Sequence, residues 1–353
     1  MQRFAFACLL VACGSDNPAG GDGGTDASSG DAGSDVVVTN DAPSSTDGGS
    51  GIPTGGTILF QEKFDDTSYA SRGWYDSSGG NVVTTEHAPG STSAFECTFA
   101  QNATGCTGGM PARHKFTPSD TGYIGVWVKF GASWVGSGQP YHPHMMHFVT
   151  NEDTDYVGPA GTHLTTYFEV LWVTGGGSPR VAIQDLSNVD TNCILKPNDS
   201  FVGCNGNFST YAFTENRSAA ACNGVAGTLD QRDCYSTNGN DTPPWYSART
   251  WRANAGAPWF TDTAGPRYKN DWHYMEAYYA LNSISNGKGV PDGKIRIAVD
   301  GENVLSSDTI LFRTGVHTTM QFDQFLILPY IGDGSPITQT MWFDDLTVAT
   351  AKP

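Results

Sequence analysis

Residues 164–174, LTTYFEVLWVT, alternate in polarity and decide the fold class. A repeat of two residues is typical of a β-strand, because successive side chains point to opposite faces of a sheet. We assign one face to the core, namely Leu164, Thr166, Phe168, Val170 and Trp172. The other face presents His163, Thr165, Tyr167, Glu169 and Leu171. Its polar members suit either the floor of a groove or a plain solvent surface.

The same short, β-branched and aromatic pattern recurs along the chain, bounded by Gly, Pro, Asp or Asn. It predicts strands over 57–64, 121–130, 180–184, 272–281, 294–299, 318–329 and 340–348. No stretch shows a helical period over about ten or more residues. Many strands separated by tight turns indicate an all-β fold, an antiparallel β-sandwich or jelly roll.

The N-terminus predicts an exported lipoprotein. Arg3 precedes an apolar run too short to span a bilayer, and residues 10–13, LVAC, resemble a bacterial lipobox. Residues 1–13 are therefore expected to be a signal peptide with lipidation at Cys13, the alternative being an ordinary secretory signal. Gly14 and Ser15 lack the acidic side chain of inner-membrane lipoproteins, which favours the outer membrane or cell surface.

Residues 14–56 are almost entirely Gly, Ser, Thr, Asp, Ala, Pro and Asn, with seven Asp and no Lys, Arg or Glu. Such a segment buries too little apolar surface to fold, so it is predicted to be a flexible acidic tether. The β-domain is then 57–353. The whole chain carries a net charge of −17, and so acidic a protein argues against nucleic acid as a partner.

Six cysteines follow the tether, and an even number in an exported chain indicates disulfides. Because each sequential pair closes a short loop, we favour Cys97–Cys106, Cys193–Cys204 and Cys222–Cys234. The last two pairs lie in 187–231, which is predicted to be a long disulfide-pinned loop. A second long loop, 238–266, carries Trp245, Tyr246, Trp251 and Trp259, which either line a sugar-binding rim or cover a sheet edge.

The C-terminal part of the chain resembles a known family. WHYMEAYYALN at 272–282, PDGKIRIAVDGENV at 291–304 and MWFDDLTV at 341–348 are similar to segments of concanavalin A-like jelly-roll polysaccharide lyases. EKFDD at 62–66, with RGWYD at 72–76, is similar to the opening strand of that family. The resemblance implies a concanavalin A-like jelly roll that cleaves an acidic, uronate-containing polysaccharide by β-elimination. Non-catalytic glycan-binding modules share this outline.

Two departures limit what the resemblance implies about single residues. The chain lacks the Glu-x-Asp-x-x-Glu motif with which glycoside hydrolases of this fold supply nucleophile and acid. It also lacks the Gln-Ile/Val-His and Tyr-x-Lys strands of the best-known alginate lyases. Catalytic roles therefore have to be assigned from the chemistry of this chain.

β-Elimination from a uronate needs a group that neutralises the substrate carboxylate, a base for the C5 proton and an acid for the leaving oxygen. Near neutral pH, His can supply the base, Tyr the acid and Arg the neutralising charge. We assign His144 as base, Tyr167 as acid and Arg113 as neutralising group, with His142 in support. Substrate binding is assigned to Glu169, Thr165, Lys115 and Trp245. The alternative is that these are ordinary surface polar residues.

Residues 140–148, PYHPHMMHF, contain three histidines. Regular alternation places His142 and His144 on one face of a strand and His147 on the other. The first two are also spaced to ligate one metal ion, with Glu152 or Asp153 assisting, and this is the alternative to acid–base chemistry.

Glu62, Asp65 and Asp344 fall on the first and last predicted strands, which commonly neighbour each other in such sandwiches. Their oxygens would suit a structural Ca²⁺, the alternative being turn capping. The sequence thus predicts a monomeric, surface-tethered polysaccharide lyase that needs no cofactor for its chemistry. A non-catalytic carbohydrate-binding lipoprotein and a purely structural surface protein are the two rival hypotheses.

Overall fold

The computed structural model describes residues 50–138, 143–159, 162–184, 250–252, 258–315 and 317–353. All of them belong to one compact unit, Ser34–Pro353. The predicted signal peptide with Cys13, nearly all of the predicted tether, His142, Trp245 and the cysteine pairs 193–204 and 222–234 lie outside the described residues. No helix in the described part of the chain is long and apolar enough to cross a membrane.

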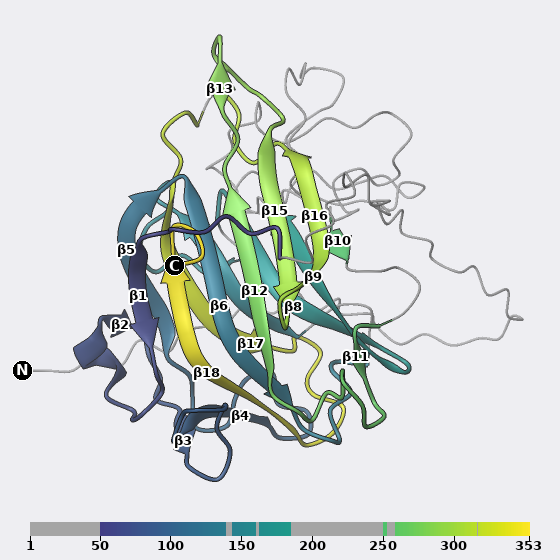
Figure 1. Cartoon of the computed structure of the whole chain (residues 1–353). Coiled ribbons are helices and arrows are strands. Elements are labelled where there is room, and N and C mark those ends of the chain that lie inside the picture. The colour runs from purple at the N-terminus through teal and green to yellow at the C-terminus, as the bar shows by residue number, and fades with distance from the viewer. Residues whose placement is uncertain (1–49, 139–142, 160–161, 185–249, 253–257, 316) are drawn as a thin grey trace, which may run out of the picture. The chain divides into compact units, whose positions relative to one another are not determined.

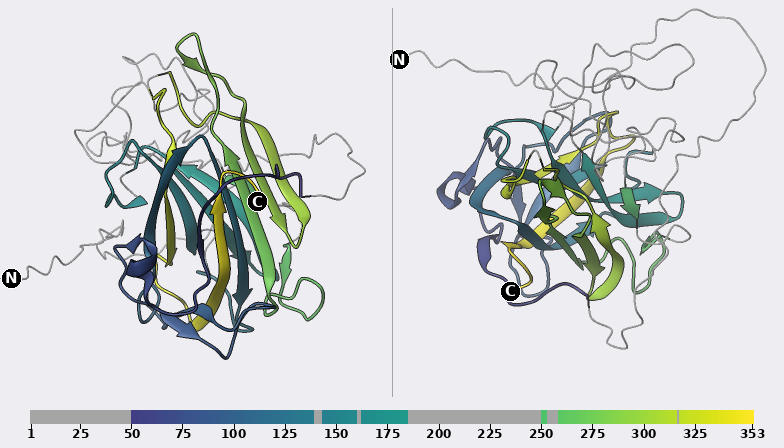
Figure 2. Two further views of the ribbon diagram at one scale, coloured as in Figure 1. Left: turned by 60° about the vertical axis from the view of Figure 1, so that its left-hand side comes forward. Right: turned by 90° about the horizontal axis from the view of Figure 1, so that it is seen from above.

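The described residues form two antiparallel sheets, one in front of the other in Figure 1. The front sheet has the order β16 (Glu302–Ile310), β15 (Gly293–Val299), β12 (His273–Ala280), β6 (Thr121–Phe130), β18 (Gln339–Ala349), β4 (Ala94–Phe99) and β3 (Asn81–Val83), with β1 (Ile58–Glu62) also paired to β18. The back sheet has the order β10 (Thr250–Arg252), β9 (Gly176–Gln184), β8 (Thr165–Val173), β7 (His144–Thr150), β17 (Phe322–Tyr330), β5 (Ala112–Ser119) and β2 (Trp74–Tyr75), with β11 (Phe260–Thr261) also paired to β9. Figure 2 shows the two layers from two further directions. The small elements are the 3-10 turn η1 (Tyr69–Arg72) and the hairpin of β13 (Ile284–Ser285) and β14 (Lys288–Gly289).

This architecture confirms the predicted all-β sandwich. Each predicted strand overlaps an observed one, namely β1, β6, β8, β9, β12, β15, β17 and β18. The first and last strands are hydrogen-bonded neighbours, as expected. The Cys97–Cys106 disulfide is present.

The core lies between the sheets. Leu164, Phe168, Val170 and Trp172 belong to it, as the alternation of their strand predicts. The ring of Trp172 meets Phe130 of the front sheet edge to face, with ring centroids 4.9 Å apart. A fully buried side chain of this size contributes about 1.5–3 kcal/mol through burial alone, so the alternating strands supply most of what holds the sheets together.

The folded part begins before the predicted start at Thr57. Ile52 is buried against Tyr123 and Tyr278 of the front sheet. The backbone N–H of Gly56 donates to the carbonyl of Lys352 at 3.1 Å. The end of the segment assigned to the tether is therefore part of the domain, because one apolar residue in it finds a buried site.

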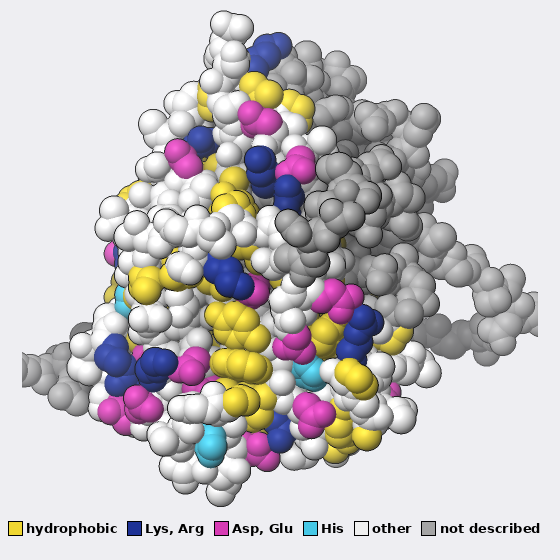
Figure 3. All heavy atoms as spheres, viewed as in Figure 1, with side chains coloured by type: hydrophobic (Ala, Val, Ile, Leu, Met, Phe, Trp, Pro, Cys, Tyr) yellow, Lys and Arg dark blue, Asp and Glu magenta, His cyan; other side chains and the backbone are white. Residues whose placement is uncertain are grey.

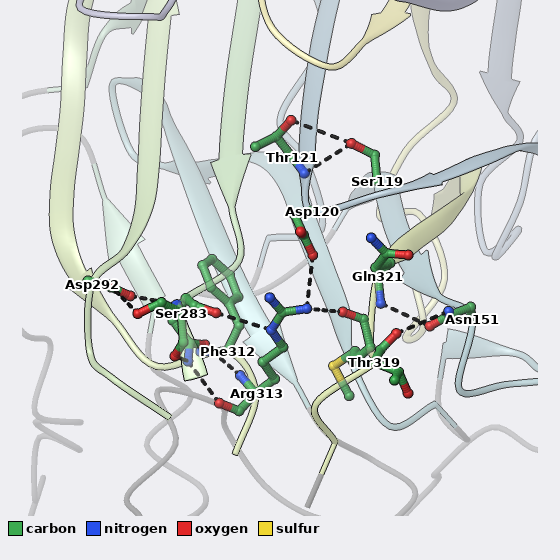
Figure 4. Close-up of polar contacts among 12 residues, drawn as sticks. Ser119, Asp120, Thr121, Asn151, Ser283, Asp292, Phe312, Arg313, Thr319 and Gln321 are labelled. Atoms are coloured by element: carbon green, nitrogen blue, oxygen red, sulfur yellow. Dashed lines mark hydrogen bonds and ion pairs between the residues drawn. The ribbon is translucent and has the colours of Figure 1, made fainter. Parts of the chain in front are cut away.

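A buried arginine fixes the crossing from β16 in the front sheet to β17 in the back sheet (Figure 4). Arg313 donates Nη1 to Oδ1 of Asp120 at 2.9 Å and Nε to the carbonyl of Asn282 at 3.1 Å. Oδ1 of Asn282 in turn accepts the backbone N–H groups of Phe312 and Arg313. Because these buried polar groups satisfy one another, the crossing is tied to the β5–β6 turn and to the end of β12. This holds β17 in place beside β7.

Candidate active site

The candidate site lies on the face of the back sheet that points away from the core. One row of directly opposed residues crosses β5, β17, β7, β8 and β9 there: Arg113, Leu326, His147, Tyr167 and Ala182. Opposed residues share a face of a sheet, and neighbouring strands lie about 4.8 Å apart. Arg113, His147 and Tyr167 therefore stand on one surface, although they are far apart in sequence.

His144 begins β7, and its ring is held by Glu169 on β8. Nδ1 of His144 lies 2.8 Å from Oε2 of Glu169. Oε1 of the same carboxylate accepts a hydrogen bond from Nε of Arg180 at 2.5 Å. A carboxylate partner favours the imidazole tautomer that carries its proton on Nδ1, which leaves the Nε2 lone pair as the basic position. His144 therefore lies against the polar face of β8.

Glu169 is an ionised group inside the protein. Its side chain is 1% exposed. Burial by itself would raise the pKa of Glu169, but the charges of Arg180 and His144 lower it to about 2. The carboxylate therefore stays ionised near neutral pH. Because Arg180 offsets its charge, it can orient His144 without repelling an anionic ligand strongly.

Tyr167 lies between the two histidines of β7. Its ring centroid is 4.5 Å from that of His144 and 4.6 Å from that of His147. Burial and then the charge of Glu169 raise the pKa of Tyr167 well above its usual value. The phenol therefore stays protonated near neutral pH, and its hydroxyl makes no hydrogen bond with any described residue. A protonated phenol is a proton donor, which suits the role of acid.

The predicted placement of His147 on the opposite face is wrong. Met145 and Met146 both belong to the core, and regular alternation does not allow this for adjacent residues. The pairing of β7 with β17 shifts register between Ile327 and Tyr330. This irregularity turns His147 to the face of His144, and their ring centroids lie 6.0 Å apart.

His147 is buried and electrically neutral. Neither of its ring nitrogens makes a hydrogen bond within the described part of the chain. Burial, and after it the charge of His144, lower the pKa of His147 to about 3. An unsatisfied buried imidazole is costly, and His147 keeps this arrangement in contact with the ring of Tyr167.

Arg113 is buried and held by two neighbours. Its Nη1 donates to Oε1 of Gln324 at 2.7 Å, and its Nε lies 3.1 Å from Oδ2 of Asp76. Its Nη2 makes no hydrogen bond with any residue that the structure describes. A guanidinium fixed in this way retains a donor for a carboxylate.

Lys115 and Thr165 lie in the next row of the sheet. Nζ of Lys115 contacts Oδ1 of Asp155 at 2.5 Å and Oδ2 of Asp323 at 3.1 Å, and its side chain is 40% exposed. The hydroxyl of Thr165 is buried against that of Thr162. Lys115 is therefore a paired cation at the edge of the site, and Thr165 supports a loop.

The two predicted metal arrangements gain no support. Nδ1 of His163 lies 2.8 Å from Asp153, and Nδ1 of His317 lies 3.2 Å from Glu152, so both carboxylates have other partners than His144. Within the described ranges, no group of three or more His, Cys, Asp or Glu residues is placed to hold a metal ion.

The three carboxylates assigned to calcium act as hydrogen-bond acceptors. Glu62 is buried and accepts from three donors, the N–H of Phe64, Nε of Arg72 and Nε1 of Trp74, each at 2.8 Å. Asp344 accepts the N–H groups of Ala88 and Asp345, and Asp65 lies 3.5 Å from Oγ of Ser93. These contacts fit the alternative in which the carboxylates cap turns and strand ends.

Sequence reasoning missed His147, Arg180 and Gln324. The hairpin of β8 and β9 contains the signal for Arg180. A two-residue turn at Thr174 and Gly175 pairs Val173 with Gly176 and therefore places Glu169 opposite Arg180. Gly175 has a φ of 96°, which glycine adopts readily. The pairings that bring in His147 and Gln324 join strands far apart in sequence.

Solved structures of similar fold include several polysaccharide lyases. An alginate lyase from Chlorella virus has 10% sequence identity and a TM-score of 0.47, over 83% of this chain and 99% of its own. The alginate lyase Aly36B has 13% identity and a TM-score of 0.46, over 83% and 96%. An endo-β-1,4-glucuronan lyase from the fungus Trichoderma reesei has 14% identity and a TM-score of 0.41, over 84% and 95%. No protein-family model matches the sequence, and neither does any curated protein.

Proposed function

We propose that the protein is a polysaccharide lyase that cleaves a uronate-containing glycan by β-elimination on the outer face of the back sheet. The observation that carries this proposal is the contact of a carboxylate-oriented histidine, His144, with a buried and protonated tyrosine, Tyr167. Arg113, a fixed guanidinium, stands on the same face. A base, an acid and a cation are the three groups that elimination from a uronate requires.

Each group has one task in the reaction. Arg113 binds the substrate carboxylate and stabilises the negative charge that develops when C5 loses its proton. Nε2 of His144 takes that proton, and the electron pair of the C5–H bond forms the C4=C5 double bond. The C4–O bond breaks, its electron pair goes to the leaving oxygen, and Tyr167 protonates that oxygen. Solvent then returns His144 and Tyr167 to their starting protonation states.

The local charge of the site repels an anionic substrate less than the net charge of the whole chain would. The chain carries a net charge of −17, which would repel a polyuronate. Arg113, Lys115 and Arg180 bring three cations to the same region of the back sheet, where four carboxylates pair with them, so the local charge is close to balanced. Glu169, the carboxylate closest to the reacting groups, is paired with Arg180.

The export signal suggests where this activity takes place. The lipobox-like LVAC at 10–13 supports cleavage before Cys13 and lipid anchoring of that residue, with the acidic segment after it as a tether. The proposed enzyme then acts as a monomer on the cell surface, where polysaccharide is within reach. Cys13→Ala is expected to shift the protein from the membrane fraction to the soluble fraction.

The decisive experiment incubates the purified chain with alginate, polygalacturonate, glucuronan and a neutral β-1,4-glucan. Ultraviolet absorbance of the unsaturated uronate product is followed together with new reducing ends. Lyase action requires both signals on at least one polyuronate and neither on the neutral glucan. New reducing ends without unsaturation would show hydrolysis instead. Binding of glycan without either signal would make the protein a carbohydrate-binding module.

A further inference from the structure

The opposite side of the sandwich carries a cavity. It is hollowed into the outer face of the front sheet and has a volume of about 360 Å³. Its lining comes from four strands or their ends: Gln61, Lys63, Trp127, Tyr274, Asp345, Leu346 and Thr347. Figure 3 looks onto this face and shows a strip of apolar side chains in its middle, with charged side chains on both sides. The volume falls within the range of small-ligand sites, and the proposed catalytic groups lie on the other sheet.

Two local features of the sequence create this hollow. The pairing of β18 with β6 shifts register between Asp344 and Thr347, and Asp345 has a φ of 47°. An irregular strand with a non-glycine residue in the left-handed region is strained, and such strain persists where it directs a side chain. Gly125 lies opposite Thr347, and a Cβ there would collide with the hydroxyls of Tyr123 and Tyr274.

One part of the lining is aromatic. The rings of Trp127 and Tyr274 lie with centroids 5.3 Å apart at an interplanar angle of 57°, and both side chains are partly exposed. Val126 and Met275, the strand neighbours of these two residues, belong to the core. Because side chains alternate along a strand, both rings lie on the outer face of the sheet. Two adjacent, partly exposed rings in the lining of a cavity offer an apolar contact to a ligand.

Apart from Leu346, the rest of the lining is polar and has no net charge. Nζ of Lys63 lies 2.6 Å from Oδ1 of Asp345, and Nε2 of Gln61 donates to Oγ1 of Thr347 at 3.0 Å. The side chain of Lys63 is 61% exposed, so the polar groups remain accessible. Donors and acceptors of both kinds thus stand beside the aromatic pair.

We propose that this cavity is a non-catalytic binding site for a glycan chain. A pyranose ring has apolar C–H faces and a rim of hydroxyl groups, and it matches rings and paired polar side chains placed side by side. A lipid chain would cover these two polar pairs and offer them no hydrogen bond, and a phosphorylated ligand would need a cation without a carboxylate partner. The inference does not depend on catalysis by the back sheet.

Affinity electrophoresis of the full chain tests the proposal, with alginate, polygalacturonate, glucuronan or a neutral β-1,4-glucan in the gel. The parent protein is the variant His144→Gln/Arg113→Gln, which does not degrade the gel and binds weakly at the back sheet. We expect at least one polymer to retard this parent. Trp127→Ala in the same parent is expected to weaken that binding about tenfold or more.

Trp342→Ala is the matched control, because Trp342 is a partly exposed tryptophan on the same outer face but outside the cavity. It should leave retardation unchanged. Gln61→Ala changes an exposed side chain, and it should weaken binding even if Trp127→Ala proves unstable. Equal retardation of the parent and both cavity variants would overturn the proposal, as would a parent that no polymer retards. A protein without lyase activity that still shows the Trp127-dependent retardation would refute only the proposed function.

Discussion

Nδ1 of His144 lies 2.8 Å from Oε2 of Glu169, and this contact joins β7 to β8 at the centre of the candidate site. It gives the histidine a fixed tautomer and direction, which a general base requires. The carboxylate itself is fixed by Arg180. The orientation of the base therefore depends on a buried ion pair that does not touch the substrate in the proposed mechanism.

Glu169→Gln is expected to lower kcat more than it raises KM, because the base loses its orienting anion while the substrate contacts remain. It should also destabilise the fold by about 3–5 kcal/mol, since Arg180 is left buried without its partner. The double variant Glu169→Gln/Arg180→Met should regain most of the stability, measured by urea denaturation, but not the kcat. Recovery of kcat together with stability would show that the pair serves only the fold.

Tyr167→Phe removes a single hydroxyl that no described residue binds. We expect kcat to fall by about 10²–10⁴-fold, because the leaving oxygen loses its proton donor, while the melting temperature stays within error of the parent. Tyr279→Phe is the matched control, since it removes a hydroxyl from another buried tyrosine, one that lies in the core. An active Tyr167→Phe enzyme would contradict the assignment of the acid.

Arg113→Gln is expected to raise KM for a polyuronate by about tenfold or more, because the substrate carboxylate loses a charge-assisted hydrogen bond. Lys115→Gln is the comparison on the same strand. Its cation is 40% exposed and already paired with Asp155 and Asp323, so its effect on KM should be several-fold smaller. Equal effects of the two variants would indicate general attraction of the polymer instead of a specific contact.

The stability of the protein should depend on pH through His147. The pKa of His147 is about 3 in the folded protein and 6.5 for the free side chain. At a pH between these two values, His147 is protonated in the unfolded chain but not in the folded chain. Stability should therefore fall as the pH falls from 6.5, by about 2 kcal/mol at pH 5.

Urea denaturation of the parent and of His147→Gln between pH 6.5 and pH 5 measures this effect. Glu169 contributes little in that window, because its pKa moves from 4.5 to about 2 and its stabilisation is lost only in stronger acid. The variant should show a clearly smaller loss of stability on acidification. The same slope for both proteins would mean that His147 is accessible to protons in the folded state.

How far the sequence predicts the site depends on how local each contact is. The period-two pattern of 164–174 is enough to place Tyr167 and Glu169 on one face, because alternation within a strand needs no information from its neighbours. Arg113, on a strand distant in sequence, reaches the same row through the pairing of β5, β17 and β7. That order is a property of the whole sandwich and is not visible in local patterns.

His147 shows where local reasoning fails. Two adjacent methionines of its strand, Met145 and Met146, both pack in the core. The regular alternation is therefore interrupted, and His144 and His147 lie on the same outer face of the sheet. The strand itself, His144–Thr150, contains no glycine or proline that would mark this irregularity. The packing of the two methionines produces the irregularity. The two histidines, predicted to lie on opposite faces of the strand, are therefore neighbours on one face.

The most direct test of the account is the rate at which His144→Gln forms unsaturated uronate, compared with the parent at equal concentration and equal folded fraction. The parent is expected to produce the ultraviolet-absorbing product from at least one polyuronate. His144→Gln, with an unchanged melting temperature, is expected to lose about 10²–10⁴-fold in kcat, because its general base is removed. A His144→Gln protein that eliminates at the rate of the parent would contradict the central claim.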